Sequence, residues 1–194
     1  MLSRRRLATA LVMAPCIVVA PCARAAPGGA PGRADFPNVE LLNQDGKTLR
    51  FYDDLIRGDH TVVINFIYAQ CGDICPLTMT HLSQVQLLLG EKLGRQVRVA
   101  SITIDPVRDS AAVLMGYARQ FDARPGWQFL TGWPNDIDRV RRKLGAVDRD
   151  PEIDKDKSQH TGMLVYGNQV RGRWSRVSGL ANPQQIFASI TRWI

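Results

Sequence analysis

The chain has little of what most catalytic or nucleic-acid-binding proteins carry. Its 194 residues include four cysteines, three histidines and 7% aromatic residues. It contains no glycine-rich phosphate loop, no serine, histidine and aspartate set of the hydrolase kind, and no motif for stacking nucleic-acid bases. Four cysteines are also too few for a small disulfide-stapled fold. An apolar fraction of 45% with 22% charged residues nevertheless indicates a folded chain, and its length indicates one domain.

A long hydrophobic run is also lacking. The apolar stretch at residues 7–22 has 16 residues, whereas a membrane span needs about 20. Arginines at 4–6 precede this stretch, and Ala23-Arg24-Ala25 follows it as a small-x-small cleavage pattern. Residues 1–25 therefore predict a signal peptide, or alternatively an uncleaved membrane anchor. The expected location is the periplasm or the outer face of the cytoplasmic membrane.

Removing this segment changes the counts that matter for function. The formal net charge falls from +7 to +3, because four arginines and no acidic residue leave with residues 1–25. Two cysteines remain, Cys71 and Cys75, in an exported, oxidising compartment. A charge this small predicts no nucleic-acid partner. Residues 26–35, rich in alanine, proline and glycine, predict a flexible tether, which leaves 36–194 as the folded domain.

Hydrophobic patterning predicts an α/β fold of the thioredoxin type. Two apolar runs flank Asp45-Gly46, a strong hairpin signal, and residues 61–68 form a continuous apolar run typical of a strand buried on both faces. We expect a three-layer sandwich whose central mixed sheet carries an added N-terminal β-hairpin. The later elements expected are helices at 76–93, 109–121, 136–144 and 182–194, strands at 96–104 and 127–130, a polar surface loop at 146–160, and a hairpin pairing 163–166 with 169–174 around Gly167-Asn168.

The sequence Cys71-Gly-Asp-Ile-Cys75-Pro76 lies where the buried strand is expected to end and the long helix to begin. Ligand sites of open α/β folds lie at this carboxyl edge, and a helix N-terminus favours the thiolate form of cysteine. Four residues of helix rise about 6 Å, which suits a disulfide or two thiolates on one soft metal. Reversible dithiol–disulfide exchange and metal binding both stay open. A purely structural disulfide would gain little from so short a loop.

His160 is the candidate third ligand. It ends the polar loop before the strand that, in a thioredoxin plan, faces the cysteine turn. His81 is expected on an exposed helix face, and His60 at the opposite end of the buried strand. Two thiolates and one imidazole suit copper as Cu(I) or Cu(II), whereas zinc would need a fourth strong ligand, for which Asp73 is the nearest candidate. The thioethers of Met79 and Met163 are expected to pack in the core.

Three segments make the sequence similar to the Sco/SenC family of copper-binding, thioredoxin-fold proteins. They are FIYAQCGDICP at 66–76, SITIDPVRDS at 101–110 and DKSQHTGMLVYG at 156–167. The resemblance implies copper ligation by Cys71, Cys75 and His160. It also implies a role in building the dinuclear copper centre of cytochrome c oxidase, by delivering copper or by reducing the target's cysteines, and often a membrane tether. Gly72 and Thr161 depart from the residues usual in the family, and neither departure removes a ligand.

Two functions follow. The leading interpretation is a copper metallochaperone rather than an enzyme, whose partners are an upstream copper donor or reductant and a recipient such as a cytochrome c oxidase subunit. The alternative is a dedicated thiol–disulfide oxidoreductase in which Cys71 and Cys75 form the redox-active pair. A peroxidase is disfavoured, because residues 64–71 lack the threonine expected before a peroxidatic cysteine. Asp105 is read either as a group near the thiolates or as a helix initiator, and the basic run at 139–143 as a solvated face.

Overall fold

The computed structural model describes residues 36–72, 74–157, 162–192 and 194. The expected signal segment and tether, Asp73 and His160 therefore lie outside the described residues. One mixed sheet runs through the molecule in the strand order β2-β1-β5-β4-β3-β6-β7. Its strands are β1 (Glu40–Asn43), β2 (Thr48–Arg50), β3 (Thr61–Ile67), β4 (Val97–Thr103), β5 (Trp127–Gly132), β6 (Met163–Asn168) and β7 (Arg173–Ser178).

Strands β3, β4 and β5 are parallel, so their carboxyl ends meet at one edge of the sheet. Strand β6 runs antiparallel to β3, and β1 runs antiparallel to β5, which adds the N-terminal hairpin to the sheet. Gly46 in the hairpin turn has a φ of 76°, a conformation that glycine adopts without strain. The predicted mixed sheet and the added N-terminal hairpin are confirmed.

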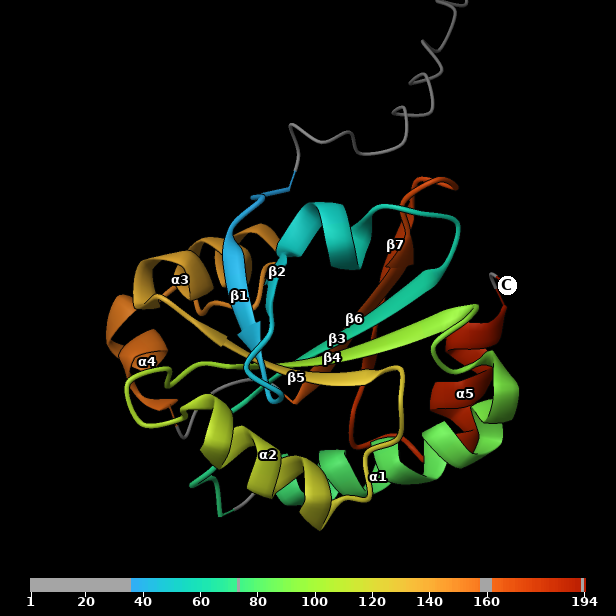
Figure 1. Cartoon of the computed structure of the whole chain (residues 1–194), viewed down its shortest axis with the longest axis horizontal. Coiled ribbons are helices and arrows are strands. Elements are labelled where there is room, and N and C mark those ends of the chain that lie inside the picture. Colours follow the sequence, from blue (N-terminus) through green and yellow to red (C-terminus); the bar gives the residue numbers. More distant parts are fainter. Residues whose placement is uncertain (1–35, 73, 158–161, 193) are drawn as a thin grey trace, which may run out of the picture.

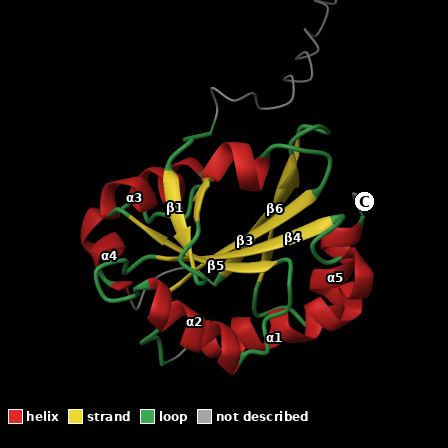
Figure 2. Ribbon diagram, in the orientation of Figure 1, coloured by secondary structure: helices red, strands yellow, loops and turns green. Residues whose placement is uncertain are grey.

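Helices cover both faces of the sheet, giving the three layers that were predicted (Figures 1 and 2). One face packs against α1 (Ile74–Leu89), α2 (Ala111–Gln120) and α5 (Pro183–Thr191). The other face packs against α3 (Pro134–Lys143) and a π-helical turn at Phe51–Ile56. Each fully buried aliphatic or aromatic side chain contributes about 1.5–3 kcal/mol. Both layers therefore stabilise the sheet.

Strand β3 shows why this sequence takes a central position. All seven of its residues are buried. Val63 and Ile67 join the core beneath α1, α2 and α5, whereas Ile64 and Phe66 join the core beneath α3. Because side chains alternate between the two faces of a strand, only a continuous apolar run satisfies both layers. The apolar run predicted at residues 61–68 supplies buried side chains to both layers.

Three local expectations were wrong. Helix α1 begins at Ile74, so Pro76 lies inside its first turn rather than at its first residue. The polar loop contains a short helix, α4 (Pro151–Lys155), because the Asp150 carboxylate accepts a hydrogen bond from the Glu152 amide and caps it.

The second hairpin turns at residues 169–172, not at Gly167-Asn168. Gly167 is a strand residue directly opposite Trp174, and a Cβ there would overlap the indole ring. This glycine serves packing rather than a turn. The Asn168 side chain accepts a hydrogen bond from the Arg171 amide, which stabilises the turn that follows.

Candidate metal centre

Cys71 and Cys75 lie at the junction between β3 and α1, on the carboxyl edge of the parallel strands. The Cys71 amide donates to the Tyr68 carbonyl at 3.1 Å, and the Cys75 amide donates to the Cys71 sulfur at 3.4 Å. Both residues carry thiols, and both are buried, with exposed fractions of 9% and 2%. The backbone turn therefore places the Cys71 sulfur against the first turn of α1, where Cys75 lies.

Burial decides the protonation of the pair. It raises the pKa of the Cys75 thiol far above the ordinary value of 9.0, and a hydrogen bond with Cys71 raises it further. A backbone hydrogen bond from Tyr68 acts in the opposite direction but is outweighed. The sequence predicted that the helix N-terminus would favour thiolate, and for Cys75 this expectation was wrong. Without a cation, Cys75 stays a neutral thiol at physiological pH.

Asp109 supports the segment that leads to the cysteines. It is 1% exposed, and one carboxylate oxygen accepts from the Ala69 amide at 3.0 Å and from the Thr103 hydroxyl at 2.5 Å. This oxygen joins the end of β4 to the turn before Cys71. The sequence predicted a helix over 109–121, which would begin at Asp109, whereas α2 begins at Ala111 with Ser110 as its cap. The signal that could have found Asp109 is the group of polar residues just past the end of β4.

Asp105 does not initiate a helix, because α2 begins six residues later with Ser110 as its cap. Its buried carboxylate forms an ion pair with Lys157 at 2.7 Å and a longer one with Arg108 at 3.6 Å. Lys157 is three positions before His160 in the chain. Asp105 therefore connects the carboxyl edge of the sheet to the segment that carries the predicted histidine ligand.

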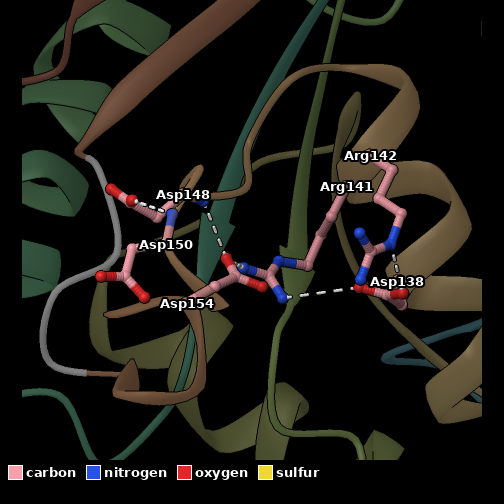
Figure 3. A network of polar contacts seen from close by, with 6 residues as sticks. All are labelled: Asp138, Arg141, Arg142, Asp148, Asp150 and Asp154. Carbon is pink, nitrogen blue, oxygen red and sulfur yellow. Dashed lines mark hydrogen bonds and ion pairs between the residues drawn. The ribbon is translucent and has the colours of Figure 1, made fainter. Parts of the chain in front are cut away.

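A second ion pair anchors the same segment farther back. Arg141 on α3 reaches Asp154 on α4 at 2.7 Å, and both side chains are mostly buried. Figure 3 shows this guanidinium lying between Asp154 and Asp138, while the Asp148 amide also donates to the Asp154 carboxylate. Part of the basic run at 139–143, predicted as a solvated face, thus holds α4 in place.

The chain re-enters the described structure at Gly162, which is also anchored. Its carbonyl accepts from the Gly179 amide at 2.7 Å, and the Gly179 carbonyl lies 2.9 Å from Nδ1 of His81 on α1. A Cβ at Gly179 would meet Thr78 and the Gly162 carbonyl. His81 was expected on an exposed face. It is half-buried instead, and it connects α1 to Gly179, the residue after β7 that is bonded to Gly162.

The remaining candidate residues have structural contacts. His60 is 7% exposed and its Nε2 lies 2.9 Å from the Leu55 carbonyl. Met79 is fully buried against Asn65, as expected. Met163 is half-buried at the start of β6, where it lines a small cavity together with Cys75 and Thr78. Within the described ranges, no three histidine, cysteine or acidic side chains form a group that could hold a metal.

Fold and site together define a thioredoxin-like protein with a buried dithiol at the carboxyl edge of its sheet. The family model described as SCO1/SenC matches residues 31–194. The chain therefore belongs to the SCO1/SenC family.

Curated relatives and solved structures agree with this. A putative copper-binding protein of Stutzerimonas stutzeri is 28% identical over 115 residues, which is 59% of this chain and 54% of the relative. A SCO1 homologue of Bacillus subtilis is 30% identical over 128 residues, 64% of each chain. The solved structure of Bradyrhizobium japonicum ScoI with copper bound is 26% identical, with a TM-score of 0.63, and covers 80% of this chain and 96% of that one.

The first three relatives matched are covered over only 48–62% of their own lengths. Among the helices that the structure describes, none combines the length and apolar character needed to cross a membrane.

Proposed function

We propose that this protein is a copper metallochaperone that binds copper through Cys71, Cys75 and His160 and passes it to a copper enzyme during cytochrome c oxidase assembly. The observation that carries the proposal is the pair of buried, adjacent thiols at the carboxyl edge of the sheet in a member of the SCO1/SenC family. A relative named as copper-binding and a similar structure solved with copper bound support the choice of metal.

The chemistry of the pair suits a transported ion. Two sulfur ligands favour Cu(I), or Cu(II) when an imidazole completes the site. Because the Cys75 thiol is protonated in the absence of a cation, copper must displace its proton, which leaves to solvent. Binding is therefore reversible by protonation and by competing ligands. A site with three protein ligands also leaves a coordination position for an incoming ligand from the recipient.

The anchored segment before His160 supports the third ligand. Ion pairs at Arg141–Asp154 and Asp105–Lys157 hold the chain up to three residues before His160. The Gly179–Gly162 hydrogen bond holds the chain two residues after it. These anchors fix the described residues on either side of His160. The proposal includes export, with the protein working in the periplasm or tethered to the outer face of the cytoplasmic membrane.

Copper titration of the purified protein, reduced and oxidised, tests the site. We expect one copper per reduced chain, no tight binding by the oxidised chain, and large losses of affinity in Cys71→Ala, Cys75→Ala and His160→Ala. Met115→Leu is the matched control, since it removes a thioether on α2 that lines a cavity with neither cysteine. Unchanged affinity in His160→Ala would overturn the three-ligand site.

The second candidate function is reduction of a partner's disulfide by the same pair. The 3.4 Å contact between the Cys75 amide and the Cys71 sulfur favours it, because an amide donor stabilises a thiolate on Cys71, the more exposed cysteine. In this reaction Cys71 attacks the partner disulfide, and Cys75 then resolves the mixed disulfide, which reduces the partner and oxidises the pair. Accumulation of a mixed disulfide in Cys75→Ser with a cysteine-containing copper protein would support it. If no mixed disulfide is trapped, this function is contradicted.

A further inference from the structure

An exposed apolar groove lies beside the carboxyl edge of the sheet, between β1, β5 and the start of α2. This groove, called the Trp133 groove, has a volume of about 560 Å³, and the residues that line it include Leu42, Val107, Ala111, Thr131, Trp133 and Pro134. Val107 and Trp133 are 83% and 77% exposed. Single exposed apolar residues are common, whereas several that gather in one groove indicate a surface that binds another molecule.

The position of Trp133 does not explain why it is a tryptophan. Trp133 is the N-cap of α3, and this position favours serine, threonine, aspartate or asparagine, whose side-chain oxygen accepts a hydrogen bond from the first turn. An indole has a donor and no acceptor, so it cannot cap a helix in this way. The sequence therefore places a poor cap here and leaves a large ring in solvent. Tryptophan is enriched among the residues that dominate the binding energy of protein interfaces.

The turn at residues 105–109 belongs both to this groove and to the surroundings of the proposed metal centre. Asp109 in this turn accepts a hydrogen bond at 3.0 Å from the Ala69 amide, two residues before Cys71. Val107 in the same turn lines the groove. A molecule seated in the groove therefore lies beside the segment that carries Cys71.

The charge at this turn indicates what kind of molecule fits. The Asp105 carboxylate lies 2.7 Å from the Lys157 ammonium and 3.6 Å from the Arg108 guanidinium, so one negative charge faces two positive ones. Arg108 forms the longer pair and is the more exposed of the two cations. Glu40 lines the groove from β1, which directs an acidic group of the bound molecule toward Arg108 instead.

We propose that the Trp133 groove docks the protein that receives copper from this chain, with an apolar side chain of that partner against Trp133 and a carboxylate near Arg108. The inference rests on the proposed copper-transfer function. In direct ligand exchange a donor atom of the partner bonds to the ion while Cys71, the more exposed cysteine, still holds it. Each released cysteine sulfur takes a proton from solvent, and the oxidation state of copper does not change. The partner must therefore dock beside the cysteine turn, where this groove lies.

The test uses Trp133→Ser and Arg108→Met in the whole chain. The probe is the copper-site domain of a cytochrome c oxidase subunit, prepared without copper. Calorimetric titration measures binding of the probe, and stopped-flow absorbance measures copper transfer to it. Chelator competition gives the copper affinity, and chemical denaturation gives the metal-free stability. Val170→Ser is the matched control, because it removes an exposed apolar side chain in the turn after β6, at the opposite edge of the sheet.

For Trp133→Ser we expect the affinity for the probe and the rate of copper transfer to fall about tenfold, as at an interface hot spot. Its copper affinity should be unchanged, and its stability should be unchanged or higher, because serine can cap α3. Arg108→Met should weaken probe binding about threefold, the size of an exposed charge pair. Val170→Ser should change none of these measurements.

Unchanged probe binding in Trp133→Ser would overturn the inference, as would a loss of stability that matches the loss of binding. A dimer of this chain that depends on Trp133 in sedimentation would also overturn it, because a second copy would then occupy the groove. If the parent chain binds the probe through Trp133 but binds no copper, the copper function fails and the docking surface stands. If it binds copper but not the probe, the docking surface fails and copper binding stands. If it binds neither, both fail.

Discussion

Asp109→Ala should be among the most damaging substitutions outside the cysteines. One carboxylate oxygen of Asp109 accepts two hydrogen bonds, from the Thr103 hydroxyl at 2.5 Å and from the Ala69 amide at 3.0 Å. Thr103 is fully buried and Asp109 is 1% exposed, so water cannot replace the lost acceptor. A hydrogen bond to a charged group contributes about 1.5–3 kcal/mol. Alanine should therefore cost about 3–5 kcal/mol, a large part of the roughly 5–15 kcal/mol typical of a domain.

Denaturant unfolding of the reduced protein, followed by circular dichroism, measures this cost. Asp109→Asn keeps an oxygen acceptor and should lose about 1–2 kcal/mol, because only the charge assistance disappears. Thr103→Ser keeps the hydroxyl donor and serves as the mild control, whereas Thr103→Val removes it. In the double variant Thr103→Val, Asp109→Ala, the two losses should not add, since both substitutions break the same bond. Additive losses, or an Asp109→Ala cost within about 0.5 kcal/mol of zero, would show that this carboxylate does not support the turn before Cys71.

Four further predictions concern the anchors around the site and the rest of the fold. Asp154→Ala should lower the free energy of unfolding by about 2 kcal/mol, measured with denaturant, because it breaks the mostly buried ion pair with Arg141. The control Glu152→Ala breaks an exposed ion pair on the same helix and should cost less than about 0.5 kcal/mol. Lys157→Met should weaken copper binding severalfold in titration, because Lys157 forms the shorter ion pair with Asp105. Arg108→Met, which removes the longer ion pair, should leave copper affinity unchanged. Equal losses of affinity in the two variants would contradict the prediction. Gly179→Ala should lose about 1–3 kcal/mol because its Cβ would overlap Thr78, and a neutral result would mean that the turn can shift. Burial lowers the pKa of His60 below its ordinary 6.5. As the pH falls below 6.5, the unfolded chain therefore binds a proton at His60 before the folded chain does, and the stability that is present above pH 6.5 is lost. His60→Gln should flatten this pH dependence of the unfolding midpoint.

The anchors also show how the fold serves a site built from distant parts of the chain. The cysteines follow β3, Asp105 and Asp109 follow β4, and the segment before His160 follows α3. Parallel strands bring the first two groups to one edge, because their carboxyl ends coincide there. The segment before His160 is held at that edge by two ion pairs, Arg141–Asp154 and Asp105–Lys157, and not by strand pairing.

The sequence by itself determined the elements whose signals are local. The buried run of β3, the turn at Asp45-Gly46, the position of the cysteines between a strand and a helix, and the layered α/β architecture all follow from periodicity and turn chemistry. Even the family resemblance depended on short contiguous segments. These features were predictable because each depends on neighbours within a few residues along the chain.

Only the tertiary structure decided how the cysteines behave and what surrounds them. The pKa of Cys75 depends on burial by α2 and the sheet, and this outweighs the local effect of the helix N-terminus. The ion pairs of Asp105 with Lys157 and of Arg141 with Asp154 join residues that no local pattern connects. Desolvation and charge pairing depend on distances in space, so the site's chemistry could be read only after the chain had folded.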